Sequence, residues 1–303
     1  MATQTSVAKL NVKKEERTVG ESLTTLALRR LRRDKLTMGA IFVLALLALS
    51  SIFAPVITDA LGVSFTRVNT NQTFLPALSP GNILGTDDLG RDHLARLLYA
   101  GQVSLGIGFL AAILSLSIGV TLGITTGFYG GVIDDITNWV IATLTSIPSL
   151  FLLLIVAAVL SPTATTLILV LGLLGWTGTT RLVRGETLSL REREYVISAR
   201  AIGASPLRIM FVHILPNLFS VIVVTLAIDI GSLILAEAGL SFLGLGVKPP
   251  TPSWGNMLTN AQTFFTKGPI LVIMPGLMIF TTVLCLYIIG DGIRDAFDPT
   301  AKD

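Results

Sequence analysis

The sequence is poor in the side chains that most enzymes use for chemistry. Its 303 residues include one cysteine and two histidines, and only 14% are charged, against about 25% in a typical soluble domain. The single cysteine, Cys285, excludes a disulfide within the chain and a cysteine metal site. His93 and His213 fall on opposite sides of the membrane in the topology inferred below, so they cannot share a metal ion.

Short catalytic and nucleotide-binding motifs are absent as well. The sequence has no G-x-x-x-x-G-K-[ST] phosphate loop, no H-E-x-x-H zinc motif and no G-x-S-x-G nucleophile elbow. The chain therefore does not bind ATP through a phosphate loop. The absence of the zinc and nucleophile motifs argues against a membrane-embedded protease or metalloenzyme. We predict a chain that is not an enzyme and that holds no catalytic residue, metal or cofactor.

Long apolar runs are what the sequence has instead. Hydrophobic residues make up 51% of the chain, and a helix needs about 20 apolar residues to cross about 30 Å of hydrocarbon. Six runs approach or exceed this length, at 38–58, 103–128, 136–160, 164–180, 212–236 and 269–290. We predict an all-α polytopic membrane protein with about six transmembrane helices. The first run is too long, and lies too far from the start, for a cleavable signal peptide.

Positive charge is distributed unevenly between the two faces that these runs define. Basic residues cluster before the first run, from Lys9 to Lys35, and between the fourth and fifth runs, from Arg181 to Arg208; the other face holds only Arg67, Arg91, Arg96, Lys248 and Lys267. The positive-inside rule then predicts that both termini lie in the cytoplasm. Nucleic-acid binding is the alternative for such basic clusters, but beside a span they are typical of a topology signal.

Three features within the runs suggest packing or function. Gly119, Gly123 and Gly127 recur at four-residue spacing, which lets helices approach closely, either within this chain or against another subunit. Pro148 should kink the third run, and a kinked helix either lines a pathway or simply packs. Asp229 is the one acid that we place well inside a run, where it serves helix packing, faces a pore, or carries a proton or ion.

The stretch EYVISARAIGASPLRIMFVHILPN, residues 194–217, is polar and sharply punctuated. Its first part is helix-compatible, with Val196, Ala199 and Gly203 on one face. Gly203 and Pro206 interrupt it, and a second short helix can begin after Ser205 with Pro206 at its first position. We predict a helix-turn-helix that presents small residues outward for docking another protein. A solvated loop is the alternative.

This stretch resembles the cytoplasmic coupling loop of ABC-importer permeases, whose signature is Glu-Ala-Ala, three residues, Gly, nine residues, Ile-x-Leu-Pro. Ala199, Gly203 and Leu215-Pro216 match in spacing, whereas Ile197 stands at the position of the Glu. LGTDDLGRDHLARLLYAGQVSLGIG, GFYGGVIDD, AEAGLSFLGLGVKPPTPSWGNML and GDGIRDAFDP also resemble the C-type permease subunit of dipeptide, oligopeptide and nickel importers. The likeness covers nearly the whole chain.

The resemblance implies a type I ABC importer transmembrane domain that works by alternating access, coupled to ATPase subunits. It implies a second permease subunit, two ATP-binding subunits that hold ATP and Mg, an external substrate-binding protein, and a prokaryotic inner membrane as location. The implied ATPase-coupling residues are Glu194, Ala199, Gly203, Ala204, Ser205, Leu207, Leu215 and Pro216. Short peptides are the expected cargo, with nickel or another small solute as the alternative. An ion-coupled secondary transporter is a further alternative, but it predicts several intramembrane acids and internal repeats.

The expected organisation follows from the runs and the resemblance. We expect a cytoplasmic tail with a basic amphipathic helix at 1–37, a first transmembrane helix at 38–58, an external loop at 59–98, and a cytoplasmic tail at 291–303. Between them, 99–290 is expected to form the core permease domain, with the coupling loop at 191–216 and a second external loop at 237–268. The 237–268 segment is too apolar for a solvated loop, so we expect it to fold back against the membrane or a partner.

Overall fold

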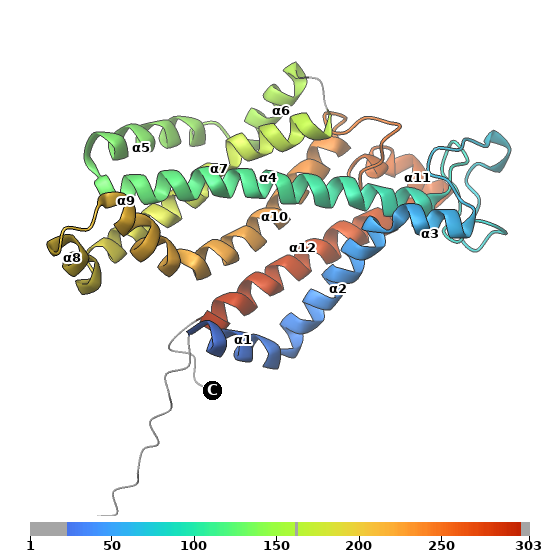
Figure 1. Cartoon of the computed structure of the whole chain (residues 1–303). Coiled ribbons are helices and arrows are strands. Elements are labelled where there is room, and N and C mark those ends of the chain that lie inside the picture. The colour runs from blue at the N-terminus through green and yellow to red at the C-terminus, as the bar shows by residue number, and fades with distance from the viewer. Residues whose placement is uncertain (1–22, 161–162, 298–303) are drawn as a thin grey trace, which may run out of the picture.

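The structure is a computed structural model, and it describes residues 23–160 and 163–297 (Figure 1). Every regular element in these ranges is helical. In chain order they are α1 (Leu23–Arg33), α2 (Lys35–Ile52), α3 (Ala54–Leu61), η1 (Thr70–Gln72), α4 (His93–Tyr129), α5 (Gly131–Thr145), α6 (Ser149–Val159), α7 (Ala164–Arg191), α8 (Glu194–Ala201), α9 (Pro206–Arg208), the π-helix η2 (Ile209–Ile214), η3 (Leu215–Leu218), α10 (Phe219–Phe242), η4 (Asn256–Leu258), α11 (Ala261–Lys267) and α12 (Ile270–Phe297). Parts of the predicted tails, 1–22 and 298–303, lie outside the described residues.

The described helices confirm an all-α membrane protein. Five are long and apolar enough to cross a membrane: α2, α4, α7, the continuous helix Pro206–Phe242 and α12; a sixth span results if α5 and α6 count as one. The third predicted run is thus two helices, bent by 82° at the break that ends in Pro148. The first predicted run is also divided. α3 restarts at Ala54, where Pro55 at the helix start lacks the N–H that a continued helix would need.

Helices α4 and α7 form the central pair of the bundle and run in the same direction. Gly119 of α4 lies against Thr179 of α7, and one and two turns further along Gly123 meets Val183 and Gly127 meets Thr187. Two consecutive parallel spans require the chain to return between them. The described parts of this connection, α5 and α6, therefore travel back along the bundle, and counted together they give the sixth span.

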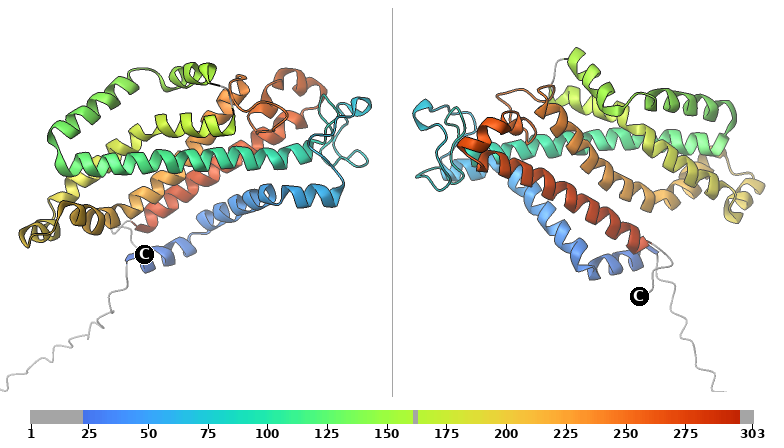
Figure 2. Two further views of the ribbon diagram at one scale, coloured as in Figure 1. Left: turned by 45° about the horizontal axis from the view of Figure 1, so that its top comes forward. Right: turned by 180° about the vertical axis from the view of Figure 1, so that it is seen from behind.

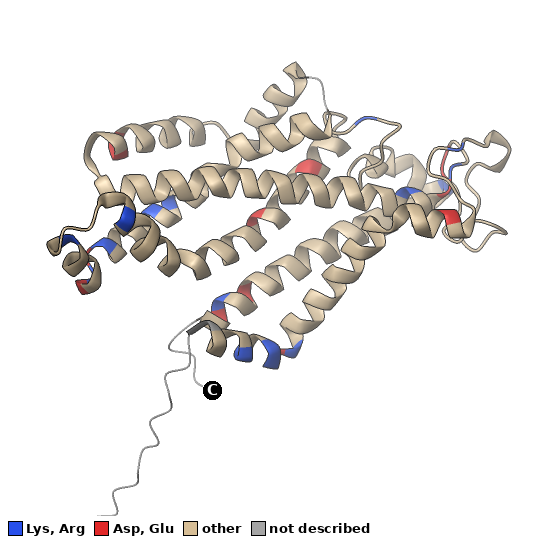
Figure 3. Cartoon of the chain, viewed as in Figure 1, with Lys and Arg blue, Asp and Glu red and all other residues tan. Residues whose placement is uncertain are grey.

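The bundle has two distinct ends, visible in Figures 1 and 2. α8, α9, the start of α2 and the last turns of α12 lie at one end, which we call the α8 end. Residues 62–92 and 243–269 lie at the other, the loop end. The described termini of the chain, Leu23 and Phe297, thus share the α8 end, while the assignment of that end to the cytoplasm stays a prediction. Figure 3 shows that basic residues gather there and along α1, with few charged residues in the helices between.

The segment after α10 packs against the bundle of its own chain. Trp254 is only 1% exposed and packs with Leu97 and Ala100 of α4, Ala238 of α10 and Ile279 of α12. The Trp254 indole Nε1 donates to the Leu97 carbonyl at 3.1 Å. The segment folds back onto the bundle of its own chain, because burying a tryptophan between three helices removes a large apolar area from water. The expected contact with the membrane or a partner stays a prediction.

Candidate functional site

The segment from Glu194 to Pro216 forms the tip of the α8 end, and its turn is fixed by backbone hydrogen bonds. Gly203 follows the last residues of α8 with φ +85°. Its N–H donates to the Arg200 carbonyl at 3.1 Å, and the Ala204 N–H donates to the Ala199 carbonyl at 3.0 Å. This pair of bonds is a Schellman motif, which requires the left-handed conformation that glycine adopts without strain.

The second short helix begins as the sequence predicts. Ser205 is the N-cap of α9, its Oγ accepts the Arg208 N–H at 3.3 Å, and Pro206 stands at the first position. The Ser205 cap and the Gly203 turn together fix the angle between α8 and α9.

One side of this segment is buried against the bundle. Val196 and Ala199 of α8 pack with Ile209 and Ile214 of η2, and the same cluster contains Ile124 of α4 and Val183 of α7. Ala199 is 6% exposed and Val196 is fully buried. The prediction that the small residues of α8 face outward is therefore wrong for Ala199, because the ends of α4 and α7 would otherwise be left uncovered.

The opposite side of the segment is open and partly apolar. Ile202 is 86% exposed and Leu207 is 62% exposed. Among the other predicted coupling residues, Glu194, Gly203, Ser205 and Pro216 are exposed, whereas Ala204 and Leu215 are half-buried. Two large aliphatic side chains beside the Gly203 turn thus make a surface suited to contact with another protein.

The helical path continues without a break from α9 into α10. The π-helix η2 and the 3₁₀ turn η3 join them, and Pro206–Phe242 reads as one 37-residue helix. The change in winding falls at Pro216, whose nitrogen cannot donate to the preceding turn. The Asn217 side chain donates to the His213 carbonyl at 2.7 Å and so satisfies part of the loosened turn.

Two arginines, Arg200 of α8 and Arg191 at the end of α7, contact the end of α4. The Arg200 guanidinium lies over the Phe128 ring, 5.5 Å from its centroid. Arg191 Nη1 donates to the Gly127 carbonyl at 3.0 Å. The ends of α7 and α8 thus both contact the end of α4.

The glycines singled out in the sequence lie where α4 meets α7. A Cβ on Gly119, Gly123 or Gly127 would come within 2.6 to 2.7 Å of a Cβ on α7. These glycines therefore pack within this chain, and none of the three has room for a larger side chain.

Pro148 borders a cavity of about 400 Å³ between α5, α6, α7 and α10. Leucines and Ala236 supply most of its wall, and Thr145, Ser149 and Thr177 add hydroxyl groups. Asp229 is not part of this wall. Its carboxylate accepts a hydrogen bond from Thr179 Oγ1 at 3.1 Å, on the α7 side of α10.

A second acid lies within the apolar helix, contrary to the prediction that Asp229 is alone. α10 runs to Phe242, six residues beyond the predicted end, and so includes Glu237, which is fully buried. Ser104 Oγ donates to Glu237 at 3.0 Å and Ser241 Oγ donates at 2.7 Å. The spacing of Glu237 and Ser241, one helical turn apart after an apolar run, is the signal in the sequence that could have predicted this pair.

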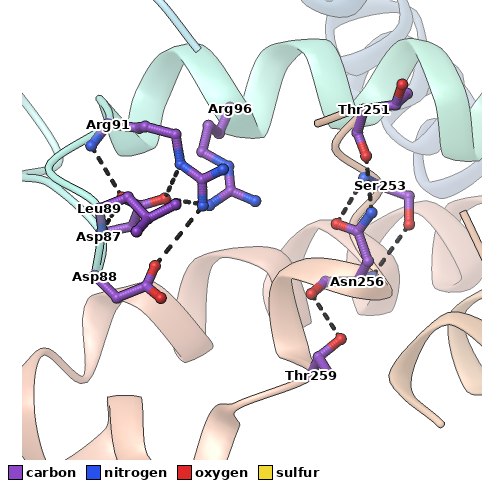
Figure 4. Close-up of polar contacts among 9 residues, drawn as sticks. All are labelled: Asp87, Asp88, Leu89, Arg91, Arg96, Thr251, Ser253, Asn256 and Thr259. Carbon is purple, nitrogen blue, oxygen red and sulfur yellow. Dashed lines mark hydrogen bonds and ion pairs between the residues drawn. The ribbon is translucent and has the colours of Figure 1, made fainter. Parts of the chain in front are cut away.

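The loop before α4 is organised by a buried carboxylate (Figure 4). Asp87 is 2% exposed, pairs with Arg91 at 2.8 Å and also with Arg96, and accepts the N–H groups of Leu89 and Arg91, both at 2.9 Å. Burial alone would raise the pKa of the Asp87 carboxyl, but Arg96, the Arg91 N–H and the Arg91 charge outweigh it and hold this pKa below its usual range. Asp87 thus stays ionised and stabilises the loop at neutral pH.

A second group of polar contacts in Figure 4 stabilises the loop that carries Trp254. Asn256 Nδ2 donates to the carbonyls of Val247, at 3.0 Å, and Thr251, at 2.9 Å, while Asn256 Oδ1 accepts the Ser253 N–H at 3.0 Å. The Trp254 N–H then reaches Ser104 Oγ at 3.1 Å. Ser104 therefore connects the loop to Glu237.

Comparison with known proteins places this architecture in a family. Residues 119–303 match the family described as binding-protein-dependent transport system inner membrane component, and residues 22–80 match the N-terminal TM domain of oligopeptide transport permease C. The chain belongs to the binding-protein-dependent transport system inner membrane component family. The resemblance drawn from the coupling-loop motif is therefore confirmed.

Curated relatives cover most of the permease. It is 39% identical to the dipeptide transport system permease protein DppC of Haemophilus influenzae over 88% of this chain and 90% of that protein. It is 36% identical to the oligopeptide transport system permease protein OppC of Bacillus subtilis, over 91% and 89% of the two chains. With the glutathione transport system permease protein GsiD of Pectobacterium atrosepticum it shares 40% identity over 74% of each.

The fold has a counterpart among solved structures. A chain from the inward-facing MetNI methionine ABC transporter aligns with a TM-score of 0.51 and 18% identity, covering 66% of the permease and 96% of that chain. The permease therefore has the fold of an ABC importer transmembrane domain. In the described part of the permease, no group of three or more His, Cys, Asp or Glu side chains is placed to hold a metal ion.

Proposed function

We propose that the permease is one membrane half of an ATP-driven importer for short peptides. In this proposal a second permease, two ATP-binding subunits and an external binding protein complete the complex in the inner membrane of a prokaryote. ATP and Mg²⁺ are held by the ATP-binding subunits, so this chain supplies no catalytic residue and needs no nucleic acid. Both termini and the α8 end face the cytoplasm, in keeping with the basic residues there.

The observation that carries the proposal is the two-sided segment from Glu194 to Pro216. One side packs into the bundle through Val196 and Ala199, and the other leaves Ile202 and Leu207 exposed. A partner that binds the exposed side moves a helix that continues into α10. ATP-dependent closure of the partner subunits can then reach the pathway as rigid-body motion, provided the two states bind the partner differently.

The cavity beside Pro148 is the part of the pathway that we assign to this chain. The backbone is irregular at Ser146–Pro148, and irregular backbone at membrane depth is tolerated where it lines a cavity or is covered by protein. Apolar walls with a few hydroxyl groups suit a peptide, which carries both amide groups and apolar side chains. We propose the core domain at 99–290 and the coupling loop at 191–216 accordingly, and we narrow the external loops to 62–92 and 243–269, because α4 begins at His93 and α10 runs to Phe242.

The names of the relatives support peptide cargo. DppC and OppC are named for dipeptides and oligopeptides, and the third relative is named for glutathione, itself a tripeptide. Nickel is less favoured, since the cavity wall contains no His, Cys, Asp or Glu side chain. An ion-coupled transporter would need a relay of acids, whereas Asp229 and Glu237 each bond to neighbouring hydroxyl groups.

To test this proposal, we would substitute only residues on the exposed side of the segment from Glu194 to Pro216. The double variant I202D/L207D should lose the ATP-binding subunits during gentle purification from the native membrane, because two carboxylates would be buried against the partner without a counter-ion. ATP-driven uptake of a labelled dipeptide into proteoliposomes should fall with it. Leu78→Asp, at an 85% exposed position of the loop end, is the matched control and should retain both.

Wild-type recovery of the ATP-binding subunits with I202D/L207D would contradict the docking surface. Uptake of Ni²⁺ in place of the dipeptide would be compatible with the docking surface but would contradict short peptides as the cargo. Uptake driven by an ion gradient without ATP would overturn the importer mechanism as a whole.

A further inference from the structure

The junction between α1 and α2, residues 32–37, which we call the elbow, packs against α12. Ala27 of α1 is 2% exposed and Thr37 of α2 is 1% exposed. A Cβ on Gly292 of α12 would lie 2.8 Å from the Thr37 Cβ, so only glycine permits this approach. Asp34 sets the angle of the elbow, because its carboxylate accepts the Leu36 N–H at 3.0 Å and also the Thr37 hydroxyl.

The outer side of the elbow carries cations that form no ion pair with the part of the chain that the structure describes. Arg32, Arg33 and Lys35 are all exposed, and within residues 23–160 and 163–297 none of the three forms an ion pair. The nearby Asp34 is engaged in capping α2. Figure 3 marks the basic residues along α1 and at the elbow, at the α8 end of the chain.

Exposed leucines flank these cations. Leu28 is 49% exposed and Leu36 is 68% exposed. α2 is a membrane span that begins at Lys35, so the cations lie within about one turn of the point where the chain enters hydrocarbon. A helix with leucines beside a basic face at this depth lies in the interface, where leucines enter the acyl region and basic side chains reach up to the headgroups.

We propose that the outer side of the α1–α2 elbow binds the phosphate groups of anionic phospholipids, with Arg32, Arg33 and Lys35 as the binding residues. Charge complementarity and continuity with α2 favour a lipid over a soluble partner, because a lipid phosphate already lies at this level of the bilayer. Bound lipid would hold α1 against α12. This inference depends on α2 spanning the membrane and is independent of the cargo and of the ATP-binding subunits.

The test uses the full chain in nanodiscs of phosphatidylcholine that contain a small fraction of photoactivatable phosphatidylglycerol. After illumination, mass spectrometry measures the labelling of the peptide that includes the elbow. R32Q/R33Q should lower this labelling by about tenfold at low salt, since each basic residue near the surface contributes several-fold to anionic lipid binding. R32K/R33K should retain it, because lysine preserves the charge.

Two controls separate a specific site from general attraction. R193Q/R208Q removes two exposed arginines from the predicted coupling loop, 191–216, and should leave labelling of the elbow unchanged. Photoactivatable phosphatidylcholine should label the elbow equally in all variants. Equal labelling by the anionic probe in wild type and R32Q/R33Q, or an equal loss in R193Q/R208Q, would overturn the proposal.

Discussion

At the scale of single residues, the segment from Glu194 to Pro216 contains two small residues with different roles, one in packing and one in the backbone turn, which the sequence pattern does not distinguish. Gly203 and Ala199 both belong to the coupling signature, and the sequence places them together on an outward face. The structure assigns Ala199 to the buried cluster and gives Gly203 a backbone role, with no atom within 4 Å of where its Cβ would be. A glycine required for its conformation and a glycine required for a flat docking surface look the same in a sequence.

Substitution at Gly203 distinguishes these two requirements. Gly203→Ala should cost about 1 kcal/mol of stability, because alanine is strained in the left-handed conformation, and Gly203→Asn should cost less, because asparagine tolerates it. We therefore expect the thermal stability of the purified chain to rank Gly, Asn, Ala. If docking requires a small residue at position 203, Gly203→Ala should bind the ATP-binding subunits better than Gly203→Asn, which is the opposite of their order in stability. Identical behaviour of both variants in both measurements would contradict the role of the Schellman turn.

At the scale of elements, the close parallel contact of α4 and α7 organises the bundle. The contact depends on glycines whose neighbours on α7 leave no space, whereas Gly106 of the same helix has no atom within 4 Å of where its Cβ would be. Helices in lipid associate by such close packing, because the acyl chains are as apolar as the helix surfaces and the hydrophobic effect does not drive the helices together.

The prediction for this contact compares two alanines on one helix. Gly123→Ala would bring its Cβ to 2.7 Å from the Val183 Cβ and 3.0 Å from the Thr180 carbonyl oxygen, so α4 and α7 must move apart. We expect a loss of about 1–3 kcal/mol, seen as a lower melting temperature in detergent. Gly106→Ala should match or slightly exceed the wild type, because it only improves helix propensity. An equal shift in both variants would rule out the close contact as the cause.

The elements also show which parts of the fold are predictable from sequence. Spans are predictable because hydrocarbon thickness sets their length, and each predicted run overlaps a helix or a broken helix. The turn after α8 is predictable because glycine and Ser-Pro have strong local preferences. The contact between Glu237 and Ser104 is not predictable in the same way, because the two residues are 133 positions apart in the sequence. Trp254 likewise looks like a loop residue until α4, α10 and α12 are brought together.

At the scale of the whole molecule, the coupling segment and the cavity are connected through α10. α10 continues from α9 at the α8 end and contributes Leu233 and Ala236 to the wall beside Pro148. Its far end carries Glu237 and Ser241, which join it to α4 and to the loop of Trp254. In the proposed mechanism, a displacement of α9 changes the shape of the cavity while the contacts of Glu237 and Ser241 hold the loop end in place.

Neighbouring leucines of α7 test whether the cavity is part of the pathway. Leu174 lines the cavity, whereas Leu173 is 52% exposed on the outer surface of the bundle. Leu174→Trp should fill much of the free space and reduce ATP-driven peptide uptake to a small fraction of the wild-type rate, while the ATP-binding subunits still co-purify, because the coupling segment is unchanged. Leu173→Trp should leave uptake near wild type, since a tryptophan there faces lipid. Equal uptake by the two variants, measured in proteoliposomes at matched protein density, would place the peptide path elsewhere and leave the cavity as a packing defect at the bend before Pro148.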